Sequence, residues 1–407
     1  MPKISKRTAD LPASPIRKLT SLAQAAEAAG KTVYHLNIGQ PDIPTPKAFM
    51  DGVKNAELSV LSYSPSRGMP ATLEALRGYY AEHGIELSTD EMCITIGGSE
   101  AFTFAMKAAT DPGDEILVPE PFYPNYRGYS YLANINLVPI TTYAEDGFHL
   151  PSLEDMESKI TPRTRAIMFS NPGNPTGVVY TKRELERIVT LALKHDLFVI
   201  SDEVYREFVY EGEAISVFDF PELRDHAILA DSISKRISAC GARIGVIASH
   251  NPDVMSAANR MAQARLSPPS FGQLGLVAFL NDPHHADSIN SMINKFHSRR
   301  DTLYAALQEI PGIICRKPAG AFYVIAKLPI DDCEHFARFL LTDFERDGET
   351  VMVAPGTGFY QTPGMGKDEV RIAYVLEEEK LVRAVELLRE GLAAYQETMS
   401  GTAVPNE

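Results

Sequence analysis

Tryptophan is absent from this sequence of 407 residues, and cysteine occurs only four times. Cys93, Cys240, Cys315 and Cys333 form no C-x-x-C pair, which suits a reducing compartment where thiols serve as small apolar residues. The sequence also lacks a run of about 18 apolar residues that could cross a membrane, and its first residues contain no apolar signal core. These absences predict a cytoplasmic protein without a membrane partner.

An excess of positive charge is lacking as well. Lys and Arg together number 39 against 53 Asp and Glu, which gives a formal net charge of -14 at pH 7. Such a balance argues against nucleic acid as the main partner, although a local cationic pocket can still bind a small anion. There is no G-x-G-x-x-G fingerprint after a strand and no lysine-bearing P-loop, so nucleotide binding has little support. No metal site is predicted.

Short apolar runs alternate with helical patterns along the middle of the chain. Several of these runs are unbroken in Val, Ile and Leu, the pattern of strands buried on both faces. The helix expected at 181–196 opens with Thr181 as N-cap and Glu184 three residues later. Repeated strand, helix and strand imply right-handed crossovers and a doubly wound, mostly parallel α/β sheet. The expected strands are 92–97, 115–120, 135–140, 165–170, 197–203, 227–232 and 243–249.

After about residue 285 the pattern changes to long helices around the strand-like run "GAFYVIAKL". The length allows at least two domains. We expect an N-terminal arm over 1–45 that joins the smaller domain, a large domain over 46–285, and the rest of a smaller α+β domain over 286–407.

Polar residues collect where the expected strands end. In an open α/β sheet, ligands bind beyond the carboxyl ends of the strands. Gly98 and Ser99 follow the first strand, where a helix N-terminus suits a phosphate but a plain turn is the alternative. Tyr123, between two prolines, can stack on a flat ring or belong to the core. Asn174 lies in the rigid loop "NPGNPTG", where its amide can donate to a ligand oxygen.

The next two strand ends carry charge. Asp202 is an acid at the mouth of a buried strand, which is costly unless a salt bridge or a protonated ligand nitrogen pairs with it. Tyr205 lies three residues further on. The last group is Ser232, Ser234, Lys235 and Arg243, for which a solvated turn is the alternative. Together these groups fit a flat, phosphorylated heteroaromatic aldehyde, with Lys235 carrying the aldehyde as an imine.

Four segments also match a known family in order and spacing: "NPGNPTG" (171–177), "SDEVY" (201–205), "SISKRISACGARIG" (232–245) and "RIAYV" (371–375). The chain resembles the fold-type I, class I/II aminotransferases that use pyridoxal 5'-phosphate (PLP), and within them the bacterial aspartate aminotransferases. The resemblance runs from "LNIGQPD" to the last expected helix. It implies the PLP-dependent transferase fold (type I), with a seven-stranded mostly parallel sheet in the large domain, and a homodimer with active sites at the interface.

The resemblance also implies roles around the cofactor ring. Lys235 looks like the Schiff-base lysine, and Asp202 looks like the partner of the pyridine nitrogen. Tyr205 and Asn174 look like donors to the ring hydroxyl oxygen, and Tyr123 looks like the stacking aromatic. The residues that look like phosphate ligands are Gly98, Ser99, Ser232, Ser234 and Arg243, with Tyr63 reaching over from the neighbouring subunit.

For the substrate, Arg371 looks like the clamp on the α-carboxylate, beside Asn174 and the backbone of Gly39. Lys107, on the helix after the phosphate loop, either reaches a distal carboxylate or is a solvated helix residue. Ser14 and Arg17 can assist from the N-terminal segment. The implied reaction is a ping-pong transfer of the amino group, with aspartate and 2-oxoglutarate as the first choice of substrates and alanine or aromatic amino acids as alternatives.

Two departures from the family pattern concern the pocket. The family often has tryptophan in the G-x-R-x-G segment, where this chain has "CGARIG", and the usual "PGxxFG" is "PGTGFY" here. Neither change removes an expected cofactor ligand. A PLP-dependent β-lyase or decarboxylase would share the same cofactor site. A ligand-sensing regulator would need an added DNA-binding segment, against which the net charge argues.

Overall fold

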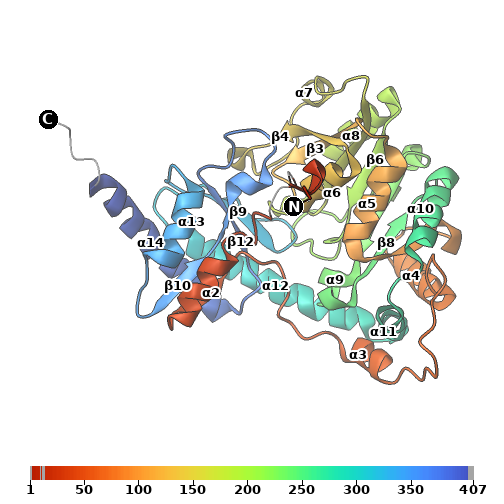
Figure 1. The fold of residues 1–407 in the computed structure, drawn as a ribbon, viewed down its shortest axis with the longest axis horizontal. Helices are drawn as coiled ribbons and strands as arrows, with labels where there is room; N and C mark the ends of the chain where they lie inside the picture. Colours follow the sequence, from red (N-terminus) through yellow and green to blue (C-terminus); the bar gives the residue numbers. More distant parts are fainter. Residues whose placement is uncertain (1, 10, 12–13, 402–407) are drawn as a thin grey trace.

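The computed structural model describes residues 2–9, 11 and 14–401, and a seven-stranded sheet forms the centre of its larger part (Figure 1). The strand order is β2-β8-β7-β6-β5-β3-β4. Only β8 runs antiparallel to its neighbours β2 and β7. The strands are β2 (Met92–Ile96), β3 (Glu115–Glu120), β4 (Asn136–Thr141), β5 (Thr164–Ser170), β6 (Phe198–Asp202), β7 (Ala227–Ser232) and β8 (Ile244–Ala248). The predicted mostly parallel α/β sheet is confirmed, and the predicted strand ends differ from these by no more than one residue.

Helices cover both faces of this sheet, and others, such as the last two of the chain, pack in the smaller part. The helices of the described residues are, in chain order, α1 (Lys6–Ala9), α2 (Thr20–Ala28), α3 (Lys47–Lys54), α4 (Pro70–Glu82), α5 (Gly97–Ala109), α6 (Asn125–Ala133), α7 (Leu153–Glu157), α8 (Lys182–His195), α9 (Ile233–Arg236), α10 (Pro252–Arg265), α11 (Ser270–Leu280), α12 (His285–Leu307), α13 (Cys333–Thr342) and α14 (Glu378–Gly401). The predicted capping box at the start of α8 is present, because Thr181 and Glu184 each accept from the other's backbone N–H.

Alternation along β7 shows how the two faces are built. Ile228 and Ala230 belong to the apolar cluster that α5 and α10 cover, whereas Leu229 belongs to the cluster that α4, α8 and α11 cover. Successive side chains of a strand point to opposite faces, so an unbroken apolar run is what a sheet covered on both sides requires.

The smaller part contains two short sheets. β9 (Tyr323–Lys327) and β11 (Ala354–Pro355) flank β12 (Glu369–Ala373) in an antiparallel sheet. β1 (Thr32–His35), from the N-terminal region, pairs in parallel with β10 (Glu349–Met352). In Figure 1 the two parts lie side by side, and α12 runs between them. Residues near both ends of the chain therefore build the smaller part.

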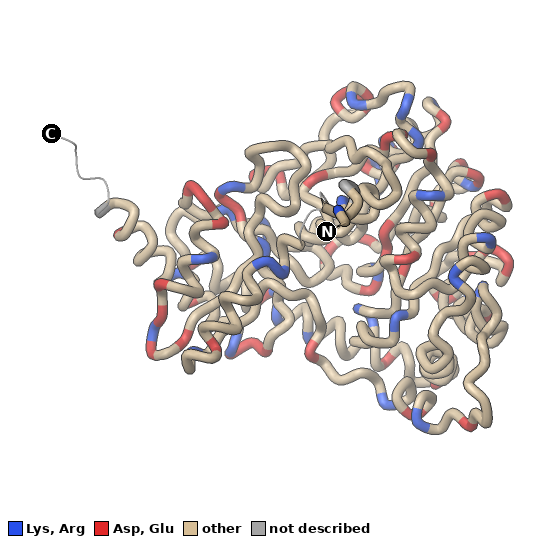
Figure 2. Tube along the Cα trace, viewed as in Figure 1, with Lys and Arg blue, Asp and Glu red and all other residues tan. Residues whose placement is uncertain are grey.

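Charge of both signs is spread over the whole molecule. Figure 2 shows Lys and Arg interspersed with Asp and Glu along both parts of the trace. No helix in the ranges 2–9, 11 and 14–401 is long and apolar enough to cross a membrane.

Candidate active site

A cavity of about 620 Å³ lies beyond the carboxyl ends of β5, β6 and β7, against β9 and β12 of the smaller part. Residues that follow different strands meet there, as the topology of an open α/β sheet requires. The predicted residues that line it are Ser14, Arg17, Gly39, Gly98, Ser99, Tyr123, Asn174, Asp202, Tyr205, Ser232, Ser234, Lys235, Arg243 and Arg371. Among the described residues, its lining contains four cations and one carboxylate, so an acidic protein here presents a cationic pocket.

Two predicted residues do not line this cavity. Lys107 is exposed in the last turn of α5, which favours the solvated alternative, and its contact to the substrate stays a prediction. The physical reason is the direction of the helix, because α5 begins at the cavity and ten residues carry the chain about 15 Å away. Tyr63 is 78% exposed on the segment before α4, and its reach into a neighbouring subunit stays a prediction.

Lys235 lies on α9, the single helical turn that follows β7. Its Nζ donates to the carbonyl oxygen of Gly39 at 2.8 Å and lies 3.8 Å from the Sγ of Cys240. The adjacent Arg236 is buried and points away, into an ion pair with Asp231. The lysine amine is therefore left facing the cavity, without a carboxylate partner among the described residues.

Asp202 ends β6 and is 3% exposed. Tyr126 OH donates to its Oδ2, and the N–H of Val204 donates to its Oδ1 at 3.2 Å. The pKa of Asp202 is raised to about 7, chiefly by burial and also by the charges of Asp231 and Glu203, against the lowering effect of the two donors. Within the described part of the chain no cation pairs with this carboxylate, so it can pair with a cationic group of a ligand.

The opposite end of the cavity collects hydroxyls, an arginine and a helix N-terminus. The Oγ atoms of Ser232 and Ser234 lie 2.9 Å apart, and Tyr129 OH donates to Ser99 Oγ at 2.8 Å. Gly97 has φ +71°, and a Cβ there would collide with the Arg243 guanidinium, so glycine lets the arginine approach the first turn of α5. No side chain caps that turn. Free N–H groups, hydroxyls and a guanidinium are together suited to a phosphate.

Arg371 on β12 is 1% exposed and defines the wall opposite the sheet. Its Nη1 donates to Asn174 Oδ1 at 3.2 Å and its Nη2 to the carbonyl oxygen of Asn37 at 2.5 Å. The guanidinium carbon lies 4.5 Å from the centre of the Tyr323 ring. Burial lowers the pKa of Arg371 from its usual value. Its Nε has no hydrogen-bond partner in the described residues. A buried guanidinium without a carboxylate is suited to an incoming carboxylate.

Sequence reasoning missed three side chains at the site. Tyr323 OH lies 2.8 Å from Tyr205 OH, and a Cβ at Gly39 would collide with the Tyr323 ring. Cys240 lines the cavity next to Lys235, and Tyr126 supports Asp202 from behind. In the sequence, Tyr323 in "GAFYVIAKL" fits the pattern of an apolar strand residue and does not indicate a place at the cavity. The contact of β9 with the segment after β6, where Tyr323 meets Tyr205, brings it to the cavity.

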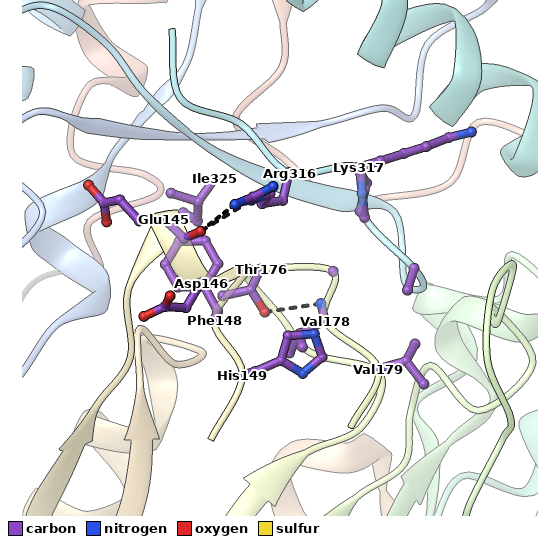
Figure 3. A pocket seen from close by; sticks show the side chains of 14 residues that line it. Glu145, Asp146, Phe148, His149, Thr176, Val178, Val179, Arg316, Lys317 and Ile325 are labelled. Atoms are coloured by element: carbon purple, nitrogen blue, oxygen red, sulfur yellow. Dashed lines mark hydrogen bonds between the residues drawn. The ribbon is translucent and has the colours of Figure 1, made fainter. Parts of the chain in front are cut away.

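A second cavity, of about 350 Å³, lies on the other side of the "NPGNPTG" loop, between residues 145–149 and 316–319 (Figure 3). Three of the cationic or titratable groups that line it already have partners inside the protein. His149 contacts Glu184 at 3.0 Å, Lys317 pairs with Asp301 at 2.9 Å, and Arg316 donates to the carbonyl oxygen of Glu145 at 2.8 Å. Among the described residues that line it, no arginine or lysine is therefore left without a partner, in contrast to the first cavity.

The first cavity fits PLP, the cofactor that the sequence resemblance implies. The α5 N-terminus, Ser232 and Arg243 suit its phosphate, and the unpaired Asp202 suits a protonated ring nitrogen. Tyr123 offers an aromatic face, and Lys235 offers an amine to the aldehyde. Each unpaired charge thus has a counterpart on the cofactor or on a carboxylate substrate.

Comparison with known proteins agrees with this geometry. The chain is 32% identical over 402 residues to the probable aspartate/prephenate aminotransferase of Aquifex aeolicus (strain VF5), covering 96% of this chain and 98% of the relative. A solved structure of a double mutant of the Thermus thermophilus aspartate aminotransferase superposes with a TM-score of 0.88 at 29% identity, covering 96% of this chain and all of that chain (100%). The alanine aminotransferase of Pyrococcus furiosus gives 0.87 at 32% identity, with 96% and 100% covered.

The family comparison covers most of the sequence. Residues 31–388 match the family described as aminotransferase class I and II, whose members depend on PLP. The predicted family, fold class and cofactor are therefore confirmed. This chain belongs to the class I and II aminotransferases.

Proposed function

We propose that this aminotransferase moves the amino group of L-aspartate to 2-oxoglutarate in two successive half-reactions. The observation that carries the proposal is a pair of arginines on one cavity, Arg371 and Arg17, neither with a carboxylate partner in the described parts of the chain. Both proposed substrates carry two carboxylates. Arg371 would bind the α-carboxylate and Arg17 the side-chain carboxylate, so the cavity matches dicarboxylic amino acids.

Arg17 is placed by the N-terminal segment around it. The side-chain amide of Asn37 donates to the carbonyl oxygen of Ile16 at 3.1 Å, and Pro15 packs so closely on Gly358 that no Cβ would fit there. The exposed Arg17 side chain follows directly and lines the cavity. Lys107 is exposed outside the cavity whereas Arg17 lines it, which supports Arg17 as the cation that meets a distal carboxylate.

Each cavity residue has a chemical task in this proposal. When bound, PLP supplies an aldehyde that exchanges amino groups and a ring that takes up the electrons released at the substrate Cα. Lys235 Nζ removes the Cα proton as a base and donates a proton as an acid, a role worth about 10²–10⁴-fold in rate. Asp202 would hold the ring nitrogen protonated, and Tyr205 and Asn174 would donate to the ring oxygen. Arg371 fixes the α-carboxylate and so sets which bond at Cα breaks.

We further propose that the protein is a homodimer. Large apolar side chains are exposed on the segment before α4 and next to α11, and Ser64 Oγ donates to the carbonyl oxygen of Pro268 at 3.3 Å, which joins the two segments. These exposed residues are Leu58, Val60, Leu61, Tyr63, Leu266 and Phe271. An apolar patch of this kind supports an interface, from which Tyr63 would reach the partner's phosphate site.

The purified holoenzyme tests the substrate proposal when it is offered a panel of amino donors. Aspartate with 2-oxoglutarate should yield oxaloacetate and glutamate. Faster half-reactions with alanine or an aromatic amino acid would reassign the donor, and pyruvate with ammonia would indicate a β-lyase.

The variant Arg17→Ala tests the side-chain contact. We expect the KM for aspartate to rise about 10- to 100-fold, the value of one charged hydrogen-bonded contact, with the KM for alanine unchanged. The matched control is Lys107→Ala, which removes a cation outside the cavity and should leave both constants unchanged. An aspartate KM that responds to Lys107 and not to Arg17 would contradict the proposed contact.

A further inference from the structure

Tyr126 is a buried tyrosine behind the cavity wall that the substrate and cofactor roles above leave unused. It lies on α6, is 1% exposed, and does not line the cavity itself. Its hydroxyl donates to Asp202 Oδ2, while the N–H of Val204 donates to the other carboxylate oxygen at 3.2 Å. Each oxygen of Asp202 thus has one donor from the protein.

Aromatic packing fixes the Tyr126 ring in place. The ring meets Tyr123 edge-on, with centroids 5.5 Å apart at 87°, and meets Phe102 edge-on at 5.3 Å and 71°. Phe122 stacks on it at 6.2 Å and 26°. Because Tyr123 and Phe102 line the cavity, one buried ring connects the aromatic wall to the carboxylate.

We propose that Tyr126 is a positioning residue that keeps Asp202 ionised and aimed into the cavity, toward the cofactor nitrogen. The inference rests on the proposed role of Asp202. It adds that this role depends on the hydroxyl group of Tyr126.

The charges around Asp202 explain why a donor is needed. Glu203 follows it on the chain and Asp231 faces it from β7, and both disfavour a further negative charge. Each of these acids already has its own cation, Arg206 for Glu203 and Arg236 for Asp231. The phenols of Tyr123 and Tyr205 also lie within electrostatic reach of Asp202. Among the described residues, the other charged side chains that line the cavity with Asp202 are Arg17, Lys235, Arg243 and Arg371.

Two donors therefore oppose the cost of burying the Asp202 charge. Burial raises the pKa of Asp202 to about 7, and the hydrogen bond from Tyr126 is the larger of the effects that lower it. Removing that bond must raise the pKa further, because the ionised form loses the stabilisation. At neutral pH more of the carboxyl would then be protonated, and a neutral acid holds a protonated nitrogen poorly.

The test compares the holoenzymes of Tyr126→Phe, Tyr374→Phe and Asp202→Asn with the wild type across pH. Tyr374→Phe is the matched control, because it also removes one buried tyrosine hydroxyl, bonded to the carbonyl oxygen of Ala321 at 3.2 Å, outside the cavity. Infrared difference spectra report the protonated carboxyl, and the band missing in Asp202→Asn assigns it. For Tyr126→Phe we expect the midpoint of the Asp202 titration to rise by about one to two pH units. We expect kcat to fall near pH 7 and recover at alkaline pH, with KM little changed.

The outcomes separate this inference from the proposed function. An unchanged midpoint and a flat pH profile in Tyr126→Phe, with only lower thermal stability, would overturn the inference and leave a structural tyrosine. A midpoint that shifts equally in Tyr374→Phe would also overturn it. Normal turnover in Asp202→Asn would instead remove the proposed role of Asp202, whatever Tyr126 does.

Discussion

Two neighbouring cations, Lys235 and Arg236, are divided between two environments. Arg236 enters a buried ion pair with Asp231, and Lys235 turns into the cavity, where its Nζ contacts the carbonyl oxygen of Gly39 and the thiol of Cys240. Among the described residues, no carboxylate pairs with this amine. This arrangement is consistent with the proposed role of Lys235 in binding an aldehyde.

The variant Lys235→Ala should lose the covalent link to the cofactor and nearly all turnover. Removing the acid–base group alone predicts a loss of at least about 10²-fold in kcat. Borohydride reduction of the wild type, followed by peptide mapping, should place the label on Lys235, and Lys107→Ala should label normally. A label on any other lysine would contradict the assignment.

Most cavity residues were predictable because strand ends carry them. Parallel strands bring their carboxyl ends to one edge, so Asn174, Asp202 and Ser232 meet whatever the loops between them do. Lys107 is close to the phosphate loop in sequence, but it lies on a helix that leads away from the cavity, so its nearness in sequence did not indicate a place in the cavity lining. Tyr126 and Tyr323 could not be predicted from the sequence, because each contacts a residue that is distant in sequence, Asp202 and Tyr205 respectively. The local sequence pattern around a tyrosine does not show such a contact.

The element α9 is short, and a buried ion pair holds it in place. Arg236 Nη2 contacts Asp231 Oδ2 and also donates to the carbonyl oxygen of Ser232 at 3.3 Å, while its guanidinium carbon lies 4.6 Å from the centre of the Tyr79 ring. Four residues cannot form a stable helix alone. The position of α9 is therefore set by this pair, at the junction with β7.

Arg236→Met should lower the free energy of unfolding by about 3–5 kcal/mol, because it leaves the buried Asp231 carboxylate without its cation. Chemical denaturation monitored by circular dichroism measures the change. The control Arg183→Met, at an exposed position on α8, should stay within about 0.5 kcal/mol of the wild type. Equal stability of the two variants would show that the Asp231–Arg236 pair contributes no net stabilisation.

At the scale of the whole molecule, the chain leaves an apolar surface beside its active site. The exposed fraction reaches 72% for Val60, 60% for Leu61 and 78% for Tyr63, values that are unusual for large apolar side chains gathered on one segment. The net charge of -14 opposes self-association, so an interface must rest on apolar contact. The proposed dimer would bury this segment and bring Tyr63 to the active-site cavity of the other subunit.

The variant Leu61→Glu tests that surface. A charge at the centre of an apolar interface must be desolvated without a partner, so we expect the dimer dissociation constant to rise at least about 100-fold. Sedimentation velocity at micromolar concentration should show a dimer for the wild type and monomer for the variant, with turnover falling alongside because Tyr63 no longer reaches its target. Leu193→Glu, at a leucine of 45% exposure on α8 away from this segment, should remain dimeric and active. A monomeric wild type with full activity would mean that each chain completes its own site and that the apolar segment serves some other contact.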